Sequence, residues 1–219
     1  MALTLKLAVW VAVILLVIGL PIAYWITYAR WRWKFLIEAV VALPLVLPPT
    51  VLGFYVLVAL GPRSPLGQAY LSWTGSTLPF TFKGLLIASV LYSLPFAVQP
   101  FAAAFSAVDT ELLEAAAVLG ASKLHTFFRI ILPLSTAGVV TGLTLSFAHT
   151  LGEFGVVLMV GGNIPGVTRT LSILIYDDVQ ALDYAAAYRT ALVLLLFSFV
   201  ILALVYGLNR RVWLGWPPK

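Results

Sequence analysis

The sequence predicts an all-α membrane protein with five transmembrane helices. Of its 219 residues, 62% are hydrophobic and only 10% are charged, and the mean hydropathy of +1.06 lies far above the range of soluble domains. A helix needs about 20 apolar residues to cross a hydrocarbon core of about 30 Å. The apolar runs that are long enough lie at about 7–29, 35–60, 84–108, 131–151 and 184–208. We therefore expect a single transmembrane domain over residues 1–219.

Two further features refine this count. The stretch 156–176 is also apolar, but its Gly-Gly-Asn and Pro-Gly turns and Arg169 would leave unsatisfied backbone groups and a charge in lipid. We expect it to be an external or partly re-entrant loop. The first span is longer than the apolar core of a signal peptide, and no small-x-small cleavage site follows it, so we expect it to remain in the mature protein.

The composition excludes several classes of protein. The chain has no Cys, which rules out disulfides and Cys-based metal or redox sites, and two His residues are too few for a His cluster. Thirteen Lys and Arg residues give a net charge of +5, but they are scattered between apolar runs and form no basic stripe for nucleic acid. We expect this chain to bind no metal, no cofactor and no nucleic acid.

The basic residues also predict the orientation of the chain. Eight lie in the loops on one side of the expected membrane, namely Arg30, Arg32, Lys34, Lys123, Arg129, Arg210, Arg211 and Lys219. Five lie on the other side, namely Lys6, Arg63, Lys83, Arg169 and Arg189. The side with more basic residues faces the cytoplasm in most membrane proteins. We therefore expect the N-terminus outside and the C-terminus in the cytoplasm.

One cytoplasmic stretch, "EAAAVLGASKLHTFFRIILP" (114–133), is too polar to lie in lipid. Asp109 and Glu111 just before it are typical of a helix start, and Gly120 of a helix end. Ser122 can cap a second short helix that runs toward Ile131. These residues predict a helix, a bend and a second helix along the cytoplasmic surface. From composition alone, this segment can equally be an amphipathic connector resting on lipid headgroups.

The order of residues in this stretch favours a specific interpretation. Glu-Ala-Ala is followed by Gly after three residues, by Ile after nine more, and by Leu-Pro, which are here Glu114, Ala115, Ala116, Gly120, Ile130, Leu132 and Pro133. This pattern resembles the complete signature of the permease subunits of ABC importers. The resemblance implies a type I ABC importer permease fold in which residues 109–130 form a cytoplasmic coupling helix.

In proteins of that family, the coupling helix docks into a groove on a separate ATP-hydrolysing subunit. The resemblance implies that Glu114 contacts the ATPase, that Ala115 and Ala116 allow close approach, and that Gly120 forms the bend. Ala121 and Ser122 belong to the same coupling surface. The chain has no G-x-x-x-x-G-K-[ST] phosphate loop, so we expect ATP and Mg to be used by a partner ATPase and not by this chain.

Three segments narrow the resemblance further. The stretches 43–61 ("LPLVLPPTVLGFYVLVALG"), 108–122 ("VDTELLEAAAVLGAS") and 151–171 ("LGEFGVVLMVGGNIPGVTRTL") together resemble molybdate ABC transporter permeases, with tungstate and sulfate permeases close behind. The resemblance implies a homodimer in a prokaryotic plasma (inner) membrane, two cytoplasmic ATPase subunits, and a soluble periplasmic or extracellular molybdate-binding protein.

Two spans contain candidate residues for the translocation path. Prolines within the second span break its helix, and broken helices are tolerated in membranes where they pack in protein or line a polar path. We expect Pro48, Pro49 and Thr50 at the dimer axis near the gate, the alternative being a kink that only fits neighbouring helices. In the fourth span, small residues such as Gly138 and Gly142 indicate close packing first. Its hydroxyls, among them Thr144 and Ser146, can offer hydrogen bonds to an oxyanion.

The outer end of the fourth span holds an acid, Glu153, which is costly near lipid unless it is wet or paired. His149 precedes it by four residues and can pair with it, but one His and one Glu are too few ligands for a metal. We interpret Glu153 as a structural lock of the outer gate or of the dimer contact. In the external loop, the backbone near Asn163 together with Arg169 can receive an anion, or the loop is simply held by hydrogen bonds.

Other classes of function find little support in the sequence. Tyr176-Asp177 faintly resembles half of an intramembrane aspartyl protease site, but there is no G-x-G-D partner and no H-E-x-x-H or G-x-S-x-G motif. A passive channel leaves the coupling signature unexplained. We therefore expect a transport subunit and not an enzyme.

Overall fold

The structure is a computed structural model that describes the backbone of residues 1–214 and the side chains of residues 1–205 and 207. Within these residues every regular element is a helix. The basic side chains of Arg210, Arg211 and Lys219, which contribute to the predicted orientation, lie outside the described residues.

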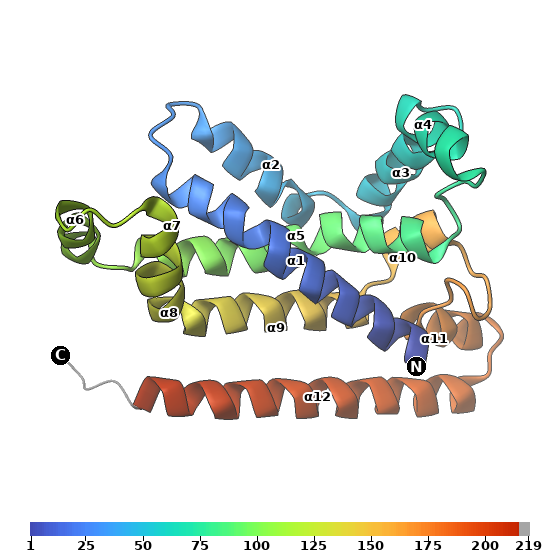
Figure 1. Ribbon diagram of the computed structural model, residues 1–219. Coiled ribbons are helices and arrows are strands. Elements are labelled where there is room, and N and C mark those ends of the chain that lie inside the picture. The colour runs from blue at the N-terminus through green and yellow to red at the C-terminus, as the bar shows by residue number, and fades with distance from the viewer. Residues whose placement is uncertain (215–219) are drawn as a thin grey trace.

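Three long helices form the centre of the molecule (Figure 1). They are α1 (Ala2–Tyr28), α5 (Phe82–Ser106) and α9 (Thr136–Gly152). They meet in an apolar core whose fully buried side chains include Leu7, Phe101 and Phe105. Because lipid tails are as apolar as these side chains, close packing holds the helices together more than removal from water does.

Glycines bring α9 close to α5. A Cβ atom at Gly142 would lie 2.7 Å from the ring of Phe101 and 2.9 Å from the carbonyl oxygen of Ala97, and a Cβ at Gly138 would collide with the side chain of Ala104. Only glycine allows the two backbones to approach this closely. The predicted packing role of the small residues in the fourth span is therefore confirmed.

Three helices are long and apolar enough to cross a membrane alone, namely α1, α5 and the first 22 residues of α12 (Tyr184–Leu214). Two bent pairs bring the number to as many as five. One pair is α2 (Lys34–Val46) with α3 (Pro49–Leu60), bent by 116°, and the other is Lys123–Leu134 with α9, bent by 74°. The five apolar runs of the sequence thus correspond to three straight helices and two broken ones.

The break between α2 and α3 follows from its prolines. Leu47 and Pro48 are extended, with ψ of 137° each, and Pro49 is the first residue of α3. A proline disfavours helical backbone in the residue before it but is well suited to the first helical position. The run 35–60 is consequently two short helices that diverge (Figure 1) rather than one kinked span.

The remaining short helices lie between these spans. Ser64 caps α4 (Pro65–Thr74), which ends at a left-handed Gly75. The stretch 156–176, expected to be a loop, instead contains α10 (Gly155–Gly161) and most of α11 (Leu171–Gln180). Three valines of α10 are fully buried, namely Val156, Val157 and Val160. The irregular part is confined to residues 162–170, and burial of α10 fits the partly re-entrant alternative.

The last helix lies at the edge of the body, where it contacts α9 and α11. Of the apolar stretch Tyr184–Val205 in α12, only Ala187 is buried, and in Figure 1 this helix runs alongside the central bundle. It leaves large apolar side chains such as Leu195 and Phe199 exposed. Such a surface is stable only against lipid or another protein.

Candidate coupling segment and gate cavity

The predicted helix, bend and second helix are present between Asp109 and Thr126. The side chain of Asp109 accepts a hydrogen bond from the backbone N–H of Glu111 at 3.0 Å and caps α6 (Thr110–Val118). Ser122 caps α7 (Lys123–Thr126) by accepting from the N–H of His125 at 3.2 Å. Both caps are the residues that the sequence predicts for this role.

The bend itself requires glycine. Gly120 has a φ of 79°, in the left-handed region that residues with a Cβ avoid. The N–H of Gly120 donates to the carbonyl of Ala117, and that of Ala121 donates to the carbonyl of Ala116, both at 3.0 Å. This pair of bonds is the Schellman arrangement that closes a helix. The predicted stop at Gly120 is confirmed.

The segment returns to the membrane through a widened turn. Residues Phe127–Ile131 form η1, a π-helical turn, and α8 (Leu132–Leu134) follows it. Pro133 has no N–H to donate and its ring crowds the carbonyl of Arg129, four residues earlier. The wide turn relieves this conflict, and its continuation leads directly into α9.

A groove of about 700 Å³ opens on this segment. Five of the six predicted coupling residues line it, and only Glu114 does not, although it is exposed on the same helix. The groove residues are Leu112, Ala115, Ala116, Leu119, Gly120, Ala121, Ser122, His125 and Ile130. The structure therefore collects on one surface the residues that the family resemblance assigns to coupling.

Two large apolar side chains at the C-terminal end of α6 are strongly exposed, and the prediction from the sequence did not include them. Val118 and Leu119 are 88% and 86% exposed, and Leu119 lines the groove. Apolar residues this open mark a contact surface. Their position within a stretch too polar for lipid is the signal in the sequence that could have identified them.

A second cavity, of about 440 Å³, lies where α3, α5, α9 and α10 meet. We call it the gate cavity. It is lined by Pro49, Thr50, Tyr92, His149, Gly152, Glu153, Phe154, Gly155, Leu158 and Met159. Three residues predicted for the translocation path, Pro49, Thr50 and Glu153, thus come together from distant parts of the sequence. The fourth, Pro48, is the neighbour of Pro49 in the chain.

Two glycines seal the contact of α3 with α10 beside this cavity. A Cβ at Gly155 would lie 2.6 Å from the Cβ of Pro49, and one at Gly53 would lie 2.8 Å from the Cβ of Met159. Real Cβ atoms essentially never come closer than 3.0 Å to such neighbours, so a side chain at either position would force these groups to shift. The broken second span is therefore held against α10 by close backbone packing.

Glu153 is buried, with 4% of its surface exposed, and lies in extended backbone (ψ 134°) between α9 and α10. Neither carboxylate oxygen has a hydrogen-bond partner within the described residues, and the hydroxyl of Ser89 has none either. Glu153 is thus a buried carboxyl group whose oxygens lack hydrogen-bond partners within the described residues.

The predicted pairing of His149 with Glu153 is wrong. His149 Nδ1 lies 3.0 Å from the hydroxyl of Ser93, and its ring stacks on Phe96 with centroids 4.0 Å apart. The prediction assumed helical spacing from His149 to Glu153, but α9 ends at Gly152. The imidazole is therefore held by α5, and no ion pair or hydrogen bond joins it to Glu153 within the described residues.

The hydroxyls predicted to face an oxyanion bond to their own helix. Thr144 Oγ1 donates to the carbonyl of Val140 at 2.8 Å, and Ser146 Oγ donates to that of Leu143 at 3.0 Å. Ser146 is fully buried and Thr144 is half-buried. Neither lines the gate cavity.

The external loop is held by hydrogen bonds, as in the second alternative given for it. The amide of Asn163 donates to both carboxylate oxygens of Asp177, at 2.8 and 2.6 Å. Arg169 Nε donates to Asn163 Oδ1 at 2.6 Å and lies 3.6 Å from Asp177. The charge of Arg169 is balanced by Asp177 inside this cluster.

The chain is similar to known transport proteins along nearly its whole length. Residues 8–214 match the family of inner membrane components of binding-protein-dependent transport systems. The molybdenum transport system permease protein ModB of Azotobacter vinelandii is 54% identical over 208 residues, which cover 95% of this chain and 92% of that protein. ModB of Escherichia coli K12 is 37% identical over 81% of this chain and 78% of that protein.

A third relative has a different name. A probable sulfate transport system permease protein, cysT of Prototheca wickerhamii, is 34% identical over 92% of this chain and 79% of that protein. Its similarity spans most of both chains, as it does for the two molybdenum permeases. The sequence alone therefore places the chain near both groups.

Solved structures show the same fold. A bacterial ABC transporter that imports alginate superimposes with a TM-score of 0.74 at 19% identity, over 96% of this chain and 79% of that one. The inward-facing methionine transporter MetNI gives 0.72 at 16% identity, over 96% and 93%. The all-helical architecture is thus that of ABC importer permeases. The chain belongs to the family of inner membrane components of binding-protein-dependent transport systems.

Proposed function

We propose that this chain is the membrane-spanning permease subunit of an ATP-driven importer for molybdate. It is a transport subunit and not an enzyme, and ATP is hydrolysed by a separate partner. The coupling segment carries this proposal, because it combines the predicted helix, the glycine bend and an apolar groove on one exposed surface. The 54% identity to ModB of Azotobacter vinelandii supports the choice of molybdate.

The continuity of the chain suggests how force reaches the gate. The coupling segment passes through η1 and α8 into α9, and the far end of α9 lines the gate cavity with His149 and Gly152. A helix of 17 residues spans about 25 Å. Because glycines fix α9 tightly on α5, a pull on α6 moves the bundle as a body and changes the gate cavity.

The partners and orientation follow the same scheme. Two copies of this chain form the path, with Pro48, Pro49, Thr50 and Glu153 near the gate between them. Two ATPase subunits dock on the coupling segments in the cytoplasm. A soluble oxyanion-binding protein delivers the ion at the outer face, where the Asn163 and Arg169 loop lies. The N-terminus is outside and the C-terminus inside, in a prokaryotic plasma membrane.

Ion uptake is the direct test of the cargo. The permease, its ATPase and its binding protein are reconstituted in vesicles, and labelled molybdate uptake is measured with excess unlabelled molybdate, tungstate or sulfate. We expect ATP-dependent uptake that sulfate fails to suppress. Sulfate is the second candidate because of the 34% identity to a sulfate permease. Equal competition by sulfate would transfer the assignment to that ion.

Copurification tests the docking surface separately. Glu114 is exposed on α6, so Glu114→Lys reverses a charge without disturbing the core. We expect the ATPase to be lost from the purified complex while the permease is still expressed. Asp178→Lys, on α11 at the other end of the bundle, is the matched charge reversal and should retain the ATPase. Retention by both variants contradicts the proposed contact.

A further inference from the structure

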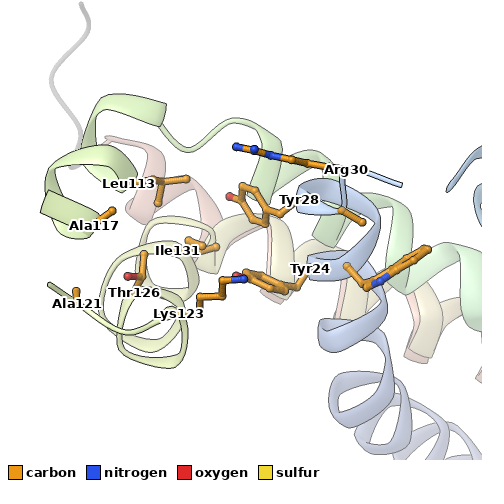
Figure 2. A pocket seen from close by; sticks show the side chains of 11 residues that line it. Tyr24, Tyr28, Arg30, Leu113, Ala117, Ala121, Lys123, Thr126 and Ile131 are labelled. Carbon is orange, nitrogen blue, oxygen red and sulfur yellow. The ribbon is translucent and has the colours of Figure 1, made fainter. Parts of the chain in front are cut away.

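A cavity of about 700 Å³ separates the end of α1 from the coupling segment. Figure 2 shows it from close by, with aromatic rings from α1 on one side and α6 and α7 on the other. Its lining residues are Tyr24, Trp25, Tyr28, Ala29, Arg30, Leu113, Ala117, Ala121, Lys123, Thr126 and Ile131. The coupling groove described above is a different surface, and the two cavities share only Ala121.

Two positively charged side chains, those of Arg30 and Lys123, line this cavity without an acidic residue beside them in the lining. Neither the side chain of Arg30 nor that of Lys123 makes a hydrogen bond or ion pair with any described residue, and no acid is among the lining residues. In Figure 2 the guanidinium of Arg30 extends over Tyr28, while the amine of Lys123 points toward Tyr24. Two positive charges facing one space favour a negatively charged ligand.

A second, apolar groove of about 400 Å³ continues from this cavity. It shares Tyr24 and Lys123 with the first. All its other lining residues are apolar, namely Leu16, Val17, Leu20, Pro21, Leu124, Phe127 and Phe128. From Tyr24 back to Leu16 the groove follows α1 for about 12 Å. It runs toward the middle of this helix, and therefore toward the middle of the membrane.

We propose that the two cavities together bind one anionic phospholipid. Its phosphate lies between Arg30 and Lys123, and an acyl chain lies in the groove along α1. A soluble phosphate would satisfy the cations but leave the groove of Phe127 and Phe128 open, whereas a phospholipid matches both parts. Tyrosine and tryptophan at the headgroup level are typical of the membrane boundary.

The position of this site gives it a mechanical role. One wall belongs to α1 and the other to α6 and α7, which the proposed function assigns to coupling. A bound lipid bridges the two and sets their resting distance. This inference goes beyond the proposed function, because it holds whichever oxyanion is carried.

Native mass spectrometry of the complete transporter tests the lipid. The purified complex is titrated with phosphatidylglycerol or with phosphatidylcholine of the same chains. Each basic residue near an anionic membrane surface adds to the free energy of lipid binding, and the removal of two such residues weakens binding roughly 30-fold. We expect that loss for Arg30→Gln/Lys123→Gln. The control Arg63→Gln/Arg189→Gln removes two exposed charges elsewhere and should bind as the unmodified complex does.

Two further arms separate the possible sources of the phosphate. Phe128 is 59% exposed in the groove, so Phe128→Ala should weaken phosphatidylglycerol severalfold without altering the charge. Inorganic phosphate or glycerol phosphate at equal concentration should not displace the lipid. The proposal is overturned if phosphatidylcholine binds as tightly as phosphatidylglycerol, if the double variant retains full binding, or if soluble phosphate displaces the lipid.

Discussion

The hydroxyl of Ser93 lies 3.0 Å from Nδ1 of His149 and joins α5 to α9 inside the bundle. The same oxygen lies 3.0 Å from the hydroxyl of Thr150. Ser93 is fully buried, so water does not replace either contact. One small side chain thus fixes the imidazole that lines the gate cavity.

Removing this hydroxyl should loosen the bundle. Interhelical hydrogen bonds in membranes contribute about 0.6 kcal/mol on average and up to about 1.7 kcal/mol. We expect Ser93→Ala to lower the free energy of unfolding by about 1 kcal/mol, measured by unfolding in mixed detergent micelles. Ser106, at the exposed end of α5, bonds through its hydroxyl to the carbonyl of Ala103 in its own helix and to no other described residue. Ser106→Ala is the control, and an equal loss in both variants would contradict the interhelical role.

The contact between Gly142 and Phe101 predicts intolerance to even one methyl group. A Cβ at this position would lie 2.7 Å from the ring and 2.9 Å from the backbone oxygen of Ala97, which cannot rotate away. Overpacking of this kind typically costs about 1–3 kcal/mol. We expect Gly142→Ala to lower the free energy of unfolding by that amount. Gly152→Ala, in the same helix and with no atom within 4 Å of its Cβ, should leave it nearly unchanged.

Removing the charge of Glu153 should have the opposite effect on stability. Burying an unpaired charge costs far more free energy than burying a neutral polar group, and neither oxygen of this carboxylate has a hydrogen-bond partner within the described residues. Glu153→Gln removes the acid but keeps its shape, so we expect equal or higher stability in detergent. Glu38→Gln, on the exposed surface of α2, should change stability by less than about 0.5 kcal/mol.

A clear loss of stability in Glu153→Gln would show that the carboxylate is paired in the folded protein. If stability is kept while ATP-driven uptake falls, the carboxylate serves transport at a cost to folding. That outcome is expected of a gate residue, since functional sites often store such strain.

Local chemistry made the coupling segment predictable. Asp109, Gly120 and Ser122 act on residues two to four positions away, so caps and bend can be read from the sequence. The apolar runs likewise predict the spans, because their length is set by the membrane. These features depend on nothing distant in the chain.

The gate cavity could not be predicted in this way. It forms because Gly53 of α3 packs on Met159 of α10, more than 100 residues away, and single-sequence patterns carry no such pairing. The prediction that His149 pairs with Glu153 failed for a related reason. Four residues separate it from Glu153, but Glu153 has left the helix, so helical spacing no longer applies.

The bend at Gly120 predicts a defect confined to coupling. Its φ of 79° strains any residue with a Cβ by about 1–2 kcal/mol, although nothing lies within 4 Å of the site. We expect Gly120→Val to uncouple ATP hydrolysis from uptake in vesicles, and Gly120→Asn to retain part of the coupling, because Asn tolerates this conformation. Gly75, at the end of α4, has a φ of 68° and equally open surroundings, so Gly75→Val carries similar strain away from the coupling segment. The ratio of ions transported to ATP hydrolysed should fall for Gly120→Val alone. A matching fall for Gly75→Val would mean that strain anywhere impairs transport, and the bend would lose its special role.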